Sequence, residues 1–298
     1  MISNIISTGL STVSVFLQRQ NSMNNQFERA VRNKLDSHNG ELDPVTLSQI
    51  TSLRIEHATQ GDLDDLFLTP SLINLSLDCE GDINLNPIGK LPLLDTFEIR
   101  NANIEDFSPL NNVNALRNLD VDNSQIASFH DIRLFENLDT LRLRNCDLDD
   151  LSFLSDLECL SRLNLNENNI EDLGPISFLD QLKSLDIEGN EVSNLDPLSY
   201  ISGLTWIHAA RNHIQDLGPL TTIKYLESLD VGRNQITNID AVSKLTHLNW
   251  LGLSFNNIRD ISPINSLPNL RYLDTVSYTH LRAHETRHDL VCRLLLEK

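Results

Sequence analysis

The chain has 298 residues, is 40% hydrophobic and carries a formal net charge of −19. This acidity opposes binding to nucleic acid and to anionic membranes, so we expect no nucleic acid partner and a protein partner that is basic or neutral. No apolar run approaches the roughly 18 residues that a membrane-spanning helix needs, and four cysteines without regular pairing indicate no disulfide framework.

Residues 1–24 are expected to form a disordered segment or a weak leader. Residues 5–17 are mildly apolar, but no Lys or Arg precedes them, and Gln18-Arg19-Gln20 would be a poor cleavage site. These features favour a cytoplasmic location for the chain as given, with a secreted or cell-surface location as the alternative.

Residues 25–49 are predicted to form an N-terminal helical cap. Phe27 and Val31 belong to an apolar set at helical spacing. Asp43 followed by Pro44 is typical of a helix start, because Asp caps the first turn and Pro fits the first helical position. The end of a repeat array needs such a cover, because its outermost apolar face would otherwise meet solvent.

A 22-residue period governs residues 50–274, which hold ten full units and the start of an eleventh. The units share the pattern LxxLxLxxNxIxxLxPLxxL. Their first positions are Ile50, Leu72, Leu94, Leu116, Leu138, Leu160, Leu182, Leu204, Leu226, Leu248 and Leu270. Such a period indicates a repeat protein in which each unit buries its apolar face against its neighbours.

Within each unit, the alternation around the fourth and sixth positions predicts a short strand, and the strands of successive units would form a parallel sheet. The remainder is too short for a full helix and should form a 3₁₀ or irregular turn. The expected fold is an α/β leucine-rich-repeat solenoid, a curved horseshoe with the sheet on its concave face and the turns on its convex face. Asparagines at the ninth position should stack as a buried polar ladder: Asn168, Asn190, Asn212, Asn234 and Asn256.

The unit, with its I-x-D/N-L-x-P-L segment, resembles the internalin-like leucine-rich repeats of bacterial proteins. The segments FERAVRNKL and GELDPVTLSQITSL are similar to the helical lead-in of many such arrays, so the resemblance covers roughly residues 27–274. It implies protein–protein recognition, since internalins are secreted proteins that bind host receptors through concave-face side chains. Eukaryotic protein-phosphatase regulatory subunits have similar units and are the second family to consider.

The repeat pattern stops after Asp274, where the acidity gives way to His and Arg. Residues 275–298 resemble a translated transposase-type sequencing adapter, so we expect this tail to be an artefact and the chain to be truncated. The tail places His280, His284, His288 and Cys292 at i, i+4 spacing. That spacing would suggest a metal site, but the resemblance to an adapter removes its biological meaning, and we predict no metal site.

The outward strand positions, read as rows across the sheet, locate a candidate contact zone in the last repeats. Trp206 and Trp250 share the third position with Ser228 between them, and two strand spacings would separate them by about 10 Å, enough to admit one side chain. Trp and Arg are typical anchors of binding energy. The predicted partner-binding residues are Trp206, His208, Arg211, Ser228, Arg233, Trp250 and Phe255. The alternative is that the two indoles only pack against their neighbours.

The sequence thus predicts a scaffold that binds a protein partner on its concave face. No Gly-rich phosphate loop and no Ser/His/Asp or Cys/His arrangement stands out, so we expect no enzyme activity, no catalytic residues and no cofactor. Two alternatives remain open. The chain would be the recognition arm of a larger enzyme whose catalytic domain is lost to the truncation, or a phosphatase-type regulatory subunit.

Overall fold

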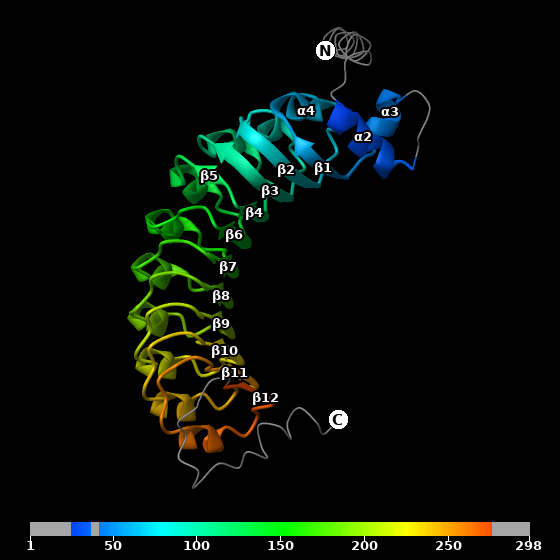
Figure 1. The fold of residues 1–298 in the computed structure, drawn as a ribbon. Coiled ribbons are helices and arrows are strands. Elements are labelled where there is room, and N and C mark those ends of the chain that lie inside the picture. Colours follow the sequence, from blue (N-terminus) through cyan, green and yellow to red (C-terminus); the bar gives the residue numbers. More distant parts are fainter. Residues whose placement is uncertain (1–24, 37–41, 276–298) are drawn as a thin grey trace. The chain divides into compact units, whose positions relative to one another are not determined.

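The structure is a computed structural model that describes residues 25–36 and 42–275 (Figure 1). The chain divides into two compact units, Met1–Asn137 and Leu138–Lys298. The expectations for residues 1–24 and for the tail from residue 276 onward, including its three His and one Cys, lie outside the described residues.

The two predicted helices, α2 (Asn25–Lys34) and α3 (Pro44–Ser48), begin the first unit. α2 is amphipathic and buries Phe27 and Val31 completely. α3 starts as predicted, because Asp43 Oδ1 accepts two backbone N–H hydrogen bonds of 2.9 Å from the first turn. These bonds satisfy donors that have no partner within the helix.

A buried carboxylate, that of Asp62, joins α2 to the first repeat. Its Oδ1 accepts a 2.8 Å hydrogen bond from the backbone N–H of Phe27, in the first turn of α2. Its Oδ2 accepts hydrogen bonds from the backbone N–H and the hydroxyl of Thr59, at 2.9 and 2.8 Å, where helix α4 (Gln60–Asp64) begins. The first repeat therefore departs from the expected 3₁₀ turn, because this capping arrangement favours a short α-helix.

The strands of the first unit form one parallel sheet in the order β1-β2-β3-β4, and β5 pairs with the far end of β3. The strands are β1 (Ser52–Ala58), β2 (Asn74–Ile83), β3 (Thr96–Ile104), β4 (Asn118–Asp122) and β5 (Gln125–Ile126). The 3₁₀ helices are η1 (Leu66–Leu68), η2 (Ile88–Lys90), η3 (Ser108–Asn112) and η4 (His130–Leu134).

One irregularity in β2 corrects the sequence interpretation of Cys79. The period places Cys79 at the outward eighth position, but Ala58 pairs with Cys79 and Gly81 pairs with Ala102, so the register slips by one residue on each side. Side chains alternate between the two faces of a strand, and the slip turns Cys79 into the core, where it is 3% exposed. Burial, with the neighbouring Asp carboxylates, raises the pKa of this thiol to about 12.

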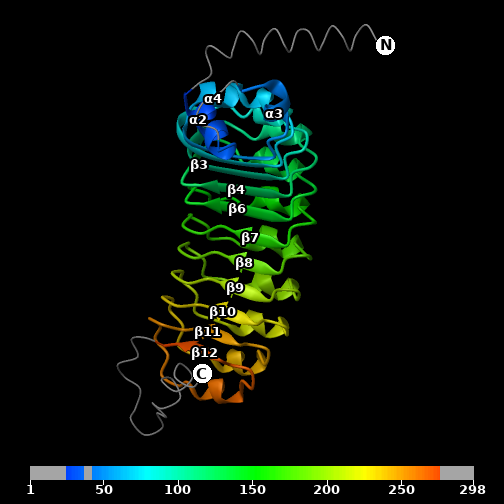
Figure 2. The ribbon, with the colours of Figure 1, turned by 90° about the vertical axis from the view of Figure 1, so that its right-hand side faces the viewer.

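The second unit continues the repeat with shorter strands in the order β6 to β12, all parallel where their register is given. The strands are β6 (Thr140–Arg144), β7 (Arg162–Asn164), β8 (Ser184–Asp186), β9 (Trp206–His208), β10 (Ser228–Asp230), β11 (Trp250–Gly252) and β12 (Tyr272–Asp274). Within this unit the strands line one side and the 3₁₀ helices the opposite side (Figures 1 and 2).

The 3₁₀ helices of the second unit recur once per repeat. They are η5 (Ser152–Asp156), η6 (Gly174–Phe178), η7 (Asp196–Tyr200), η8 (Gly218–Thr222), η9 (Asp240–Lys244) and η10 (Ser262–Ser266). An Asp or Asn precedes each of them and accepts the N–H two residues on: the Asp172–Gly174 and Asp216–Gly218 bonds are both 2.8 Å. This turn explains the D/N of the I-x-D/N-L-x-P-L segment.

The predicted asparagine ladder is present. Asn190 Nδ2 donates to the carbonyl of Leu165 at 3.0 Å, in the repeat before, and its Oδ1 accepts from the N–H of Ile170 at 3.0 Å. Asn212 and Asn234 repeat both bonds one and two units later. Each ladder Asn thus satisfies two backbone groups of the preceding repeat that burial would otherwise leave unpaired.

The eighth position of the repeat has a left-handed backbone, which the sequence interpretation missed. Its residues with positive φ are His57, Asn101, Asn123, Asn145, Glu167, Gly189, Arg211, Arg233 and Phe255, with φ from 48° to 70°. Gly and Asn adopt this region at little cost, whereas a bulky residue such as Phe is rare there. The chain turns sharply at this point, immediately before the ladder position.

Candidate functional site

The strand register brings the predicted site residues of the second unit together on one face of its sheet. Ser228 pairs with Trp206 on one side and with Trp250 on the other, and Trp250 pairs in turn with Tyr272. These four residues form the aromatic row. Trp206 is 42% exposed and Tyr272 52% exposed. Tyr272 was missed from the sequence, although the 22-residue period places it in the same column.

Both indoles lean along their own strands. The rings of Trp206 and His208 have centroids 6.3 Å apart and are tilted by 40°. Trp250 lies over Gly252, where an added Cβ would meet the indole Cη2 at 2.6 Å and Asp230 Oδ1 at 2.5 Å. Trp250 is accordingly half-buried. The local packing offered as the alternative reading is therefore part of the geometry, yet it leaves Trp206 open to solvent.

The left-handed eighth position lines a second row beside the aromatic row. Arg211 Nη1 reaches Glu167 Oε1 at 2.5 Å, two repeats away, across Gly189. A Cβ on Gly189 would lie 2.9 Å from the Glu167 carboxylate, so only glycine leaves room for this pair. Farther along the row, the guanidinium of Arg233 lies 4.2 Å from the ring centroid of Phe255, a cation–π contact.

His208 lies at the centre of this face among three carboxylates, and we name these four residues the His208 cluster. Its Nδ1 is 3.3 Å from Asp186 Oδ1, and its Nε2 is 3.4 Å from Asp230 Oδ2 and 3.5 Å from Glu188 Oε2. The contact with Asp186 raises the pKa of His208 above its usual value, the charges of Asp230 and Glu188 add to this, and burial opposes it. The carboxylates were visible as outward residues in the sequence, but nothing there signalled that they converge.

The site holds no recognisable catalytic arrangement. Within residues 25–36 and 42–275, no three His, Cys, Asp or Glu side chains are placed to hold a metal ion. Of the three cysteines in the described part of the chain, Cys79 and Cys146 are buried and Cys159 is exposed. No described helix combines the length and apolar character needed to cross a membrane.

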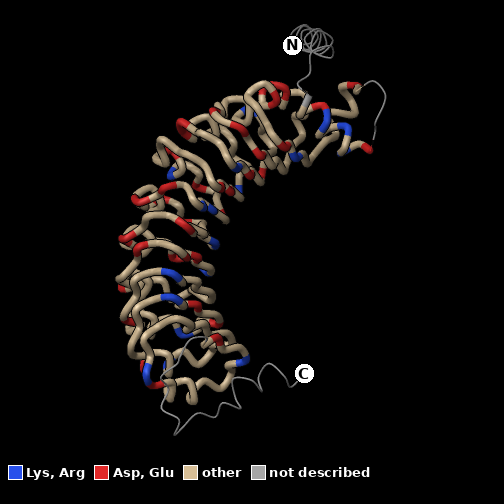
Figure 3. Tube along the Cα trace, in the orientation of Figure 1, with Lys and Arg blue, Asp and Glu red and all other residues tan. Residues whose placement is uncertain are grey.

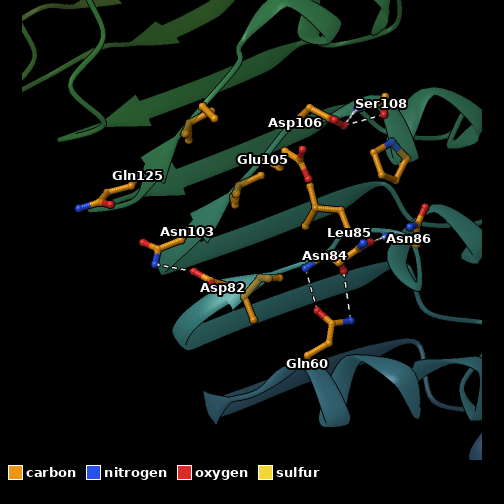
Figure 4. Close-up of a pocket in the computed structure, with 15 residues that line it drawn as sticks. Gln60, Asp82, Asn84, Leu85, Asn86, Asn103, Glu105, Asp106, Ser108 and Gln125 are labelled. Carbon is orange, nitrogen blue, oxygen red and sulfur yellow. Dashed lines mark hydrogen bonds between the residues drawn. The ribbon is translucent and has the colours of Figure 1, made fainter.

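The first unit has a shallow groove of about 820 Å³ at the far ends of β2, β3 and β5. Its walls are mostly amides and carboxylates that satisfy one another (Figure 4). Gln60 exchanges two hydrogen bonds with the backbone of Asn84, at 2.7 and 3.4 Å, and Asn103 donates to Asp82 at 2.9 Å. The lining includes no aromatic residue, so this groove has neither a stacking surface nor an unsatisfied polar group to attract a ligand.

The comparisons with known proteins agree with this fold. A leucine rich repeat family model matches residues 202–258, the part that contains both tryptophans. A comparison with curated proteins gives no match. An internalin (inlF) from Listeria monocytogenes is similar with a TM-score of 0.74 and 27% identity, over 84% of this chain and 75% of that one. A leucine-rich-repeat protein of Leptospira interrogans has a TM-score of 0.64 and 18% identity, over 85% of this chain and 81% of that one.

The same fold occurs in plant receptors. The ectodomain of a membrane receptor kinase from Arabidopsis thaliana, solved in complex with CASPARIAN STRIP INTEGRITY FACTOR 2, has a TM-score of 0.52 and 18% identity, over 75% of this chain and 34% of that one. Proteins of this fold generally serve as binding scaffolds, because the strands of successive repeats present one continuous surface.

Proposed function

We propose that this leucine-rich-repeat protein, which is similar in fold to the internalins, binds a protein partner on the outward face of the sheet in its second unit. The contact residues are Trp206, His208, Arg211, Ser228, Arg233, Trp250 and Phe255. One observation carries the proposal: the only two tryptophans of the chain share one row of this face, and beside them Trp206 and Phe255 expose 42% and 44% of their surface. Large exposed aromatic side chains of this kind anchor interfaces.

The left-handed row supports the same face. Asn101, Asn123 and Asn145 occupy the eighth position in earlier repeats, and Asn tolerates positive φ. Arg233 and Phe255 occupy it near Trp250, at φ 54° and 58°, although Phe is poorly suited to this conformation. Residues held in unfavourable backbone regions concentrate at binding sites. A side chain useful for contact is a physical reason to keep Phe255 where Asn would fold more easily.

The partner that fits best is basic or neutral. Asp and Glu total 42 residues against 23 Lys and Arg, and acidic residues recur along both units (Figure 3). A positively charged partner would be drawn to such a surface, whereas an acidic one would be repelled.

The test compares two pairs of aromatic residues in the full chain. Trp206→Ala with Trp250→Ala removes the proposed anchors, and Phe178→Ala with Tyr200→Ala removes two exposed aromatics of η6 and η7 on the opposite side. Proteins captured by the wild-type chain are purified and titrated against both double variants by calorimetry. We expect the tryptophan variant to bind at least about 30-fold more weakly for each anchor of 2 kcal/mol.

The control variant should bind like the wild type, and both variants should unfold at nearly the wild-type urea concentration. Equal affinity of the captured partner for the tryptophan variant and the wild type would overturn the proposed face. Loss of affinity in the Phe178→Ala, Tyr200→Ala variant alone would place the interface on the 3₁₀ side instead.

A further inference from the structure

The His208 cluster holds more negative charge than its own histidine can balance. Asp186, Glu188 and Asp230 supply three carboxylates, on or next to β8 and β10, and His208 on β9 supplies at most one positive charge. Arg211 is the nearest further cation, 4.0 Å from Glu188, but its guanidinium makes its 2.5 Å contact with Glu167. Arg233 lies over Phe255.

One carboxylate oxygen in the cluster lacks a hydrogen bond of good geometry. Asp186 is only 7% exposed, and its Oδ2 accepts a 3.0 Å hydrogen bond from Asn164 Nδ2. Its Oδ1 is buried, faces His208 at 3.3 Å and receives no hydrogen bond. A buried acceptor in this state costs free energy until a donor reaches it or until a nearby cation balances its charge.

The same face has an aromatic wall beside the carboxylates. The Trp250 indole and Asp230 Oδ1 converge over Gly252, and the Trp206 ring lies beside His208 on the other flank. Gly232 between them has no side chain to fill the space. A flat cation can stack on an indole while its N–H groups bond to a neighbouring carboxylate, and both contacts favour the same ligand.

We propose that the aromatic row and the His208 cluster together form a subsite for an arginine side chain presented by the protein partner. The guanidinium stacks between Trp206 and Trp250 and donates to Asp230, while its charge balances the cluster. The subsite lies on the proposed binding face, so the inference rests on the proposed function. Arginine is preferred to lysine because its planar group stacks on an indole and donates in pairs to a carboxylate.

His208 makes this subsite sensitive to pH. Both of its ring nitrogens face carboxylates, and both act as donors only when the ring is protonated. The protonated ring and the incoming guanidinium compete for the charge of Asp186, Glu188 and Asp230, so arginine binding displaces a proton. Affinity for arginine therefore falls as pH drops through the raised pKa of His208, by up to about tenfold per pH unit for one displaced proton.

The experiment uses the two tryptophans as reporters, because the chain has no others. The full chain is titrated with arginine amide at pH 8 while its intrinsic fluorescence is recorded. Citrulline amide, which is neutral with nearly the same shape, and sodium chloride at matched ionic strength are the reference titrants. We expect a saturable change with arginine amide alone.

Asp230→Asn should weaken arginine amide binding about tenfold or more while keeping the oxygen that accepts the Gly232 N–H at 2.9 Å. The matched control is Glu191→Gln, which removes the carboxylate from another His–Glu pair, 2.6 Å from His213, away from both indoles. The control should bind like the wild type. His208→Gln should bind arginine amide with little dependence on pH between 6 and 8.

Equal responses to arginine amide and citrulline amide would overturn the subsite, as would no saturable response at all or wild-type affinity in Asp230→Asn. Failure of the subsite is distinguishable from failure of the proposed face. A captured partner that tolerates Asp230→Asn but not Trp206→Ala with Trp250→Ala leaves the face standing and removes the arginine subsite. A partner that tolerates the double tryptophan variant removes both.

Discussion

Replacing Asn212 with Ala should cost more stability than its small side chain suggests. Asn212 is 5% exposed in the ladder of the second unit. Its Nδ2 donates to the carbonyl of Ile187 at 2.8 Å and, less well, to those of Ala209 and Ala210 at 3.3 and 3.1 Å. Its Oδ1 accepts from the N–H of Val192 at 2.9 Å.

The alanine leaves the Ile187 carbonyl and the Val192 N–H buried without a partner. Each such group costs about 1 to 3 kcal/mol, so the free energy of unfolding should fall by roughly 4 kcal/mol. The assay is urea unfolding followed by far-ultraviolet circular dichroism, with the slope checked to ensure that wild type and variant unfold over the same surface.

Asn257→Ala is the matched control, because Asn257 is an exposed asparagine one position after the ladder. It should change the free energy of unfolding by about 0.5 kcal/mol or less. A loss in Asn212→Ala as small as that of the control would refute the view that the ladder satisfies buried backbone groups and would make it a passive consequence of the repeat.

Three further predictions concern other parts of the chain. Asp62→Ala should lower the free energy of unfolding by about 3 kcal/mol and speed amide hydrogen exchange in α2, because it removes a buried acceptor of three hydrogen bonds; exposed Asp64→Ala should change neither. Gly189→Ala should cost about 1 to 3 kcal/mol, since alanine is strained at φ +70° and its Cβ would meet a carboxylate at 2.9 Å; urea unfolding indistinguishable from wild type would contradict this. Iodoacetamide at pH 8 should label exposed Cys159 and leave Cys79 unlabelled in peptide maps of the folded protein, and labelling of both would show that the β2 register slip is wrong.

The parts of the fold that could be predicted from the sequence are those that repeat. Asn190 and Asn212 make the same bonds to the preceding repeat, so the period alone implied their burial. Cys79 could not be placed in this way, because a slip of one residue in β2 reverses the face of its side chain and no periodic signal marks the slip.

The site shows the same division. The period placed Trp206 and Trp250 in one row, and the register confirms that placement. It did not indicate that Trp250 leans over Gly252 or that three carboxylates converge on His208, because both depend on side-chain rotamers. The left-handed eighth position had a signal in Asn101, Asn123 and Asn145, yet Arg211 and Phe255 at the same position obscured it.

The ladder bonds have a consequence for how such a chain can change length. Each ladder Asn reaches the carbonyl 25 residues before it and the N–H 20 residues before it, whichever repeat it belongs to. Deleting residues 190–211 would bring Asn212 into the place of Asn190 with the same two backbone groups before it. A recombination event that removes or duplicates one whole period in this region therefore lengthens or shortens the recognition surface by one strand without redesigning any joint.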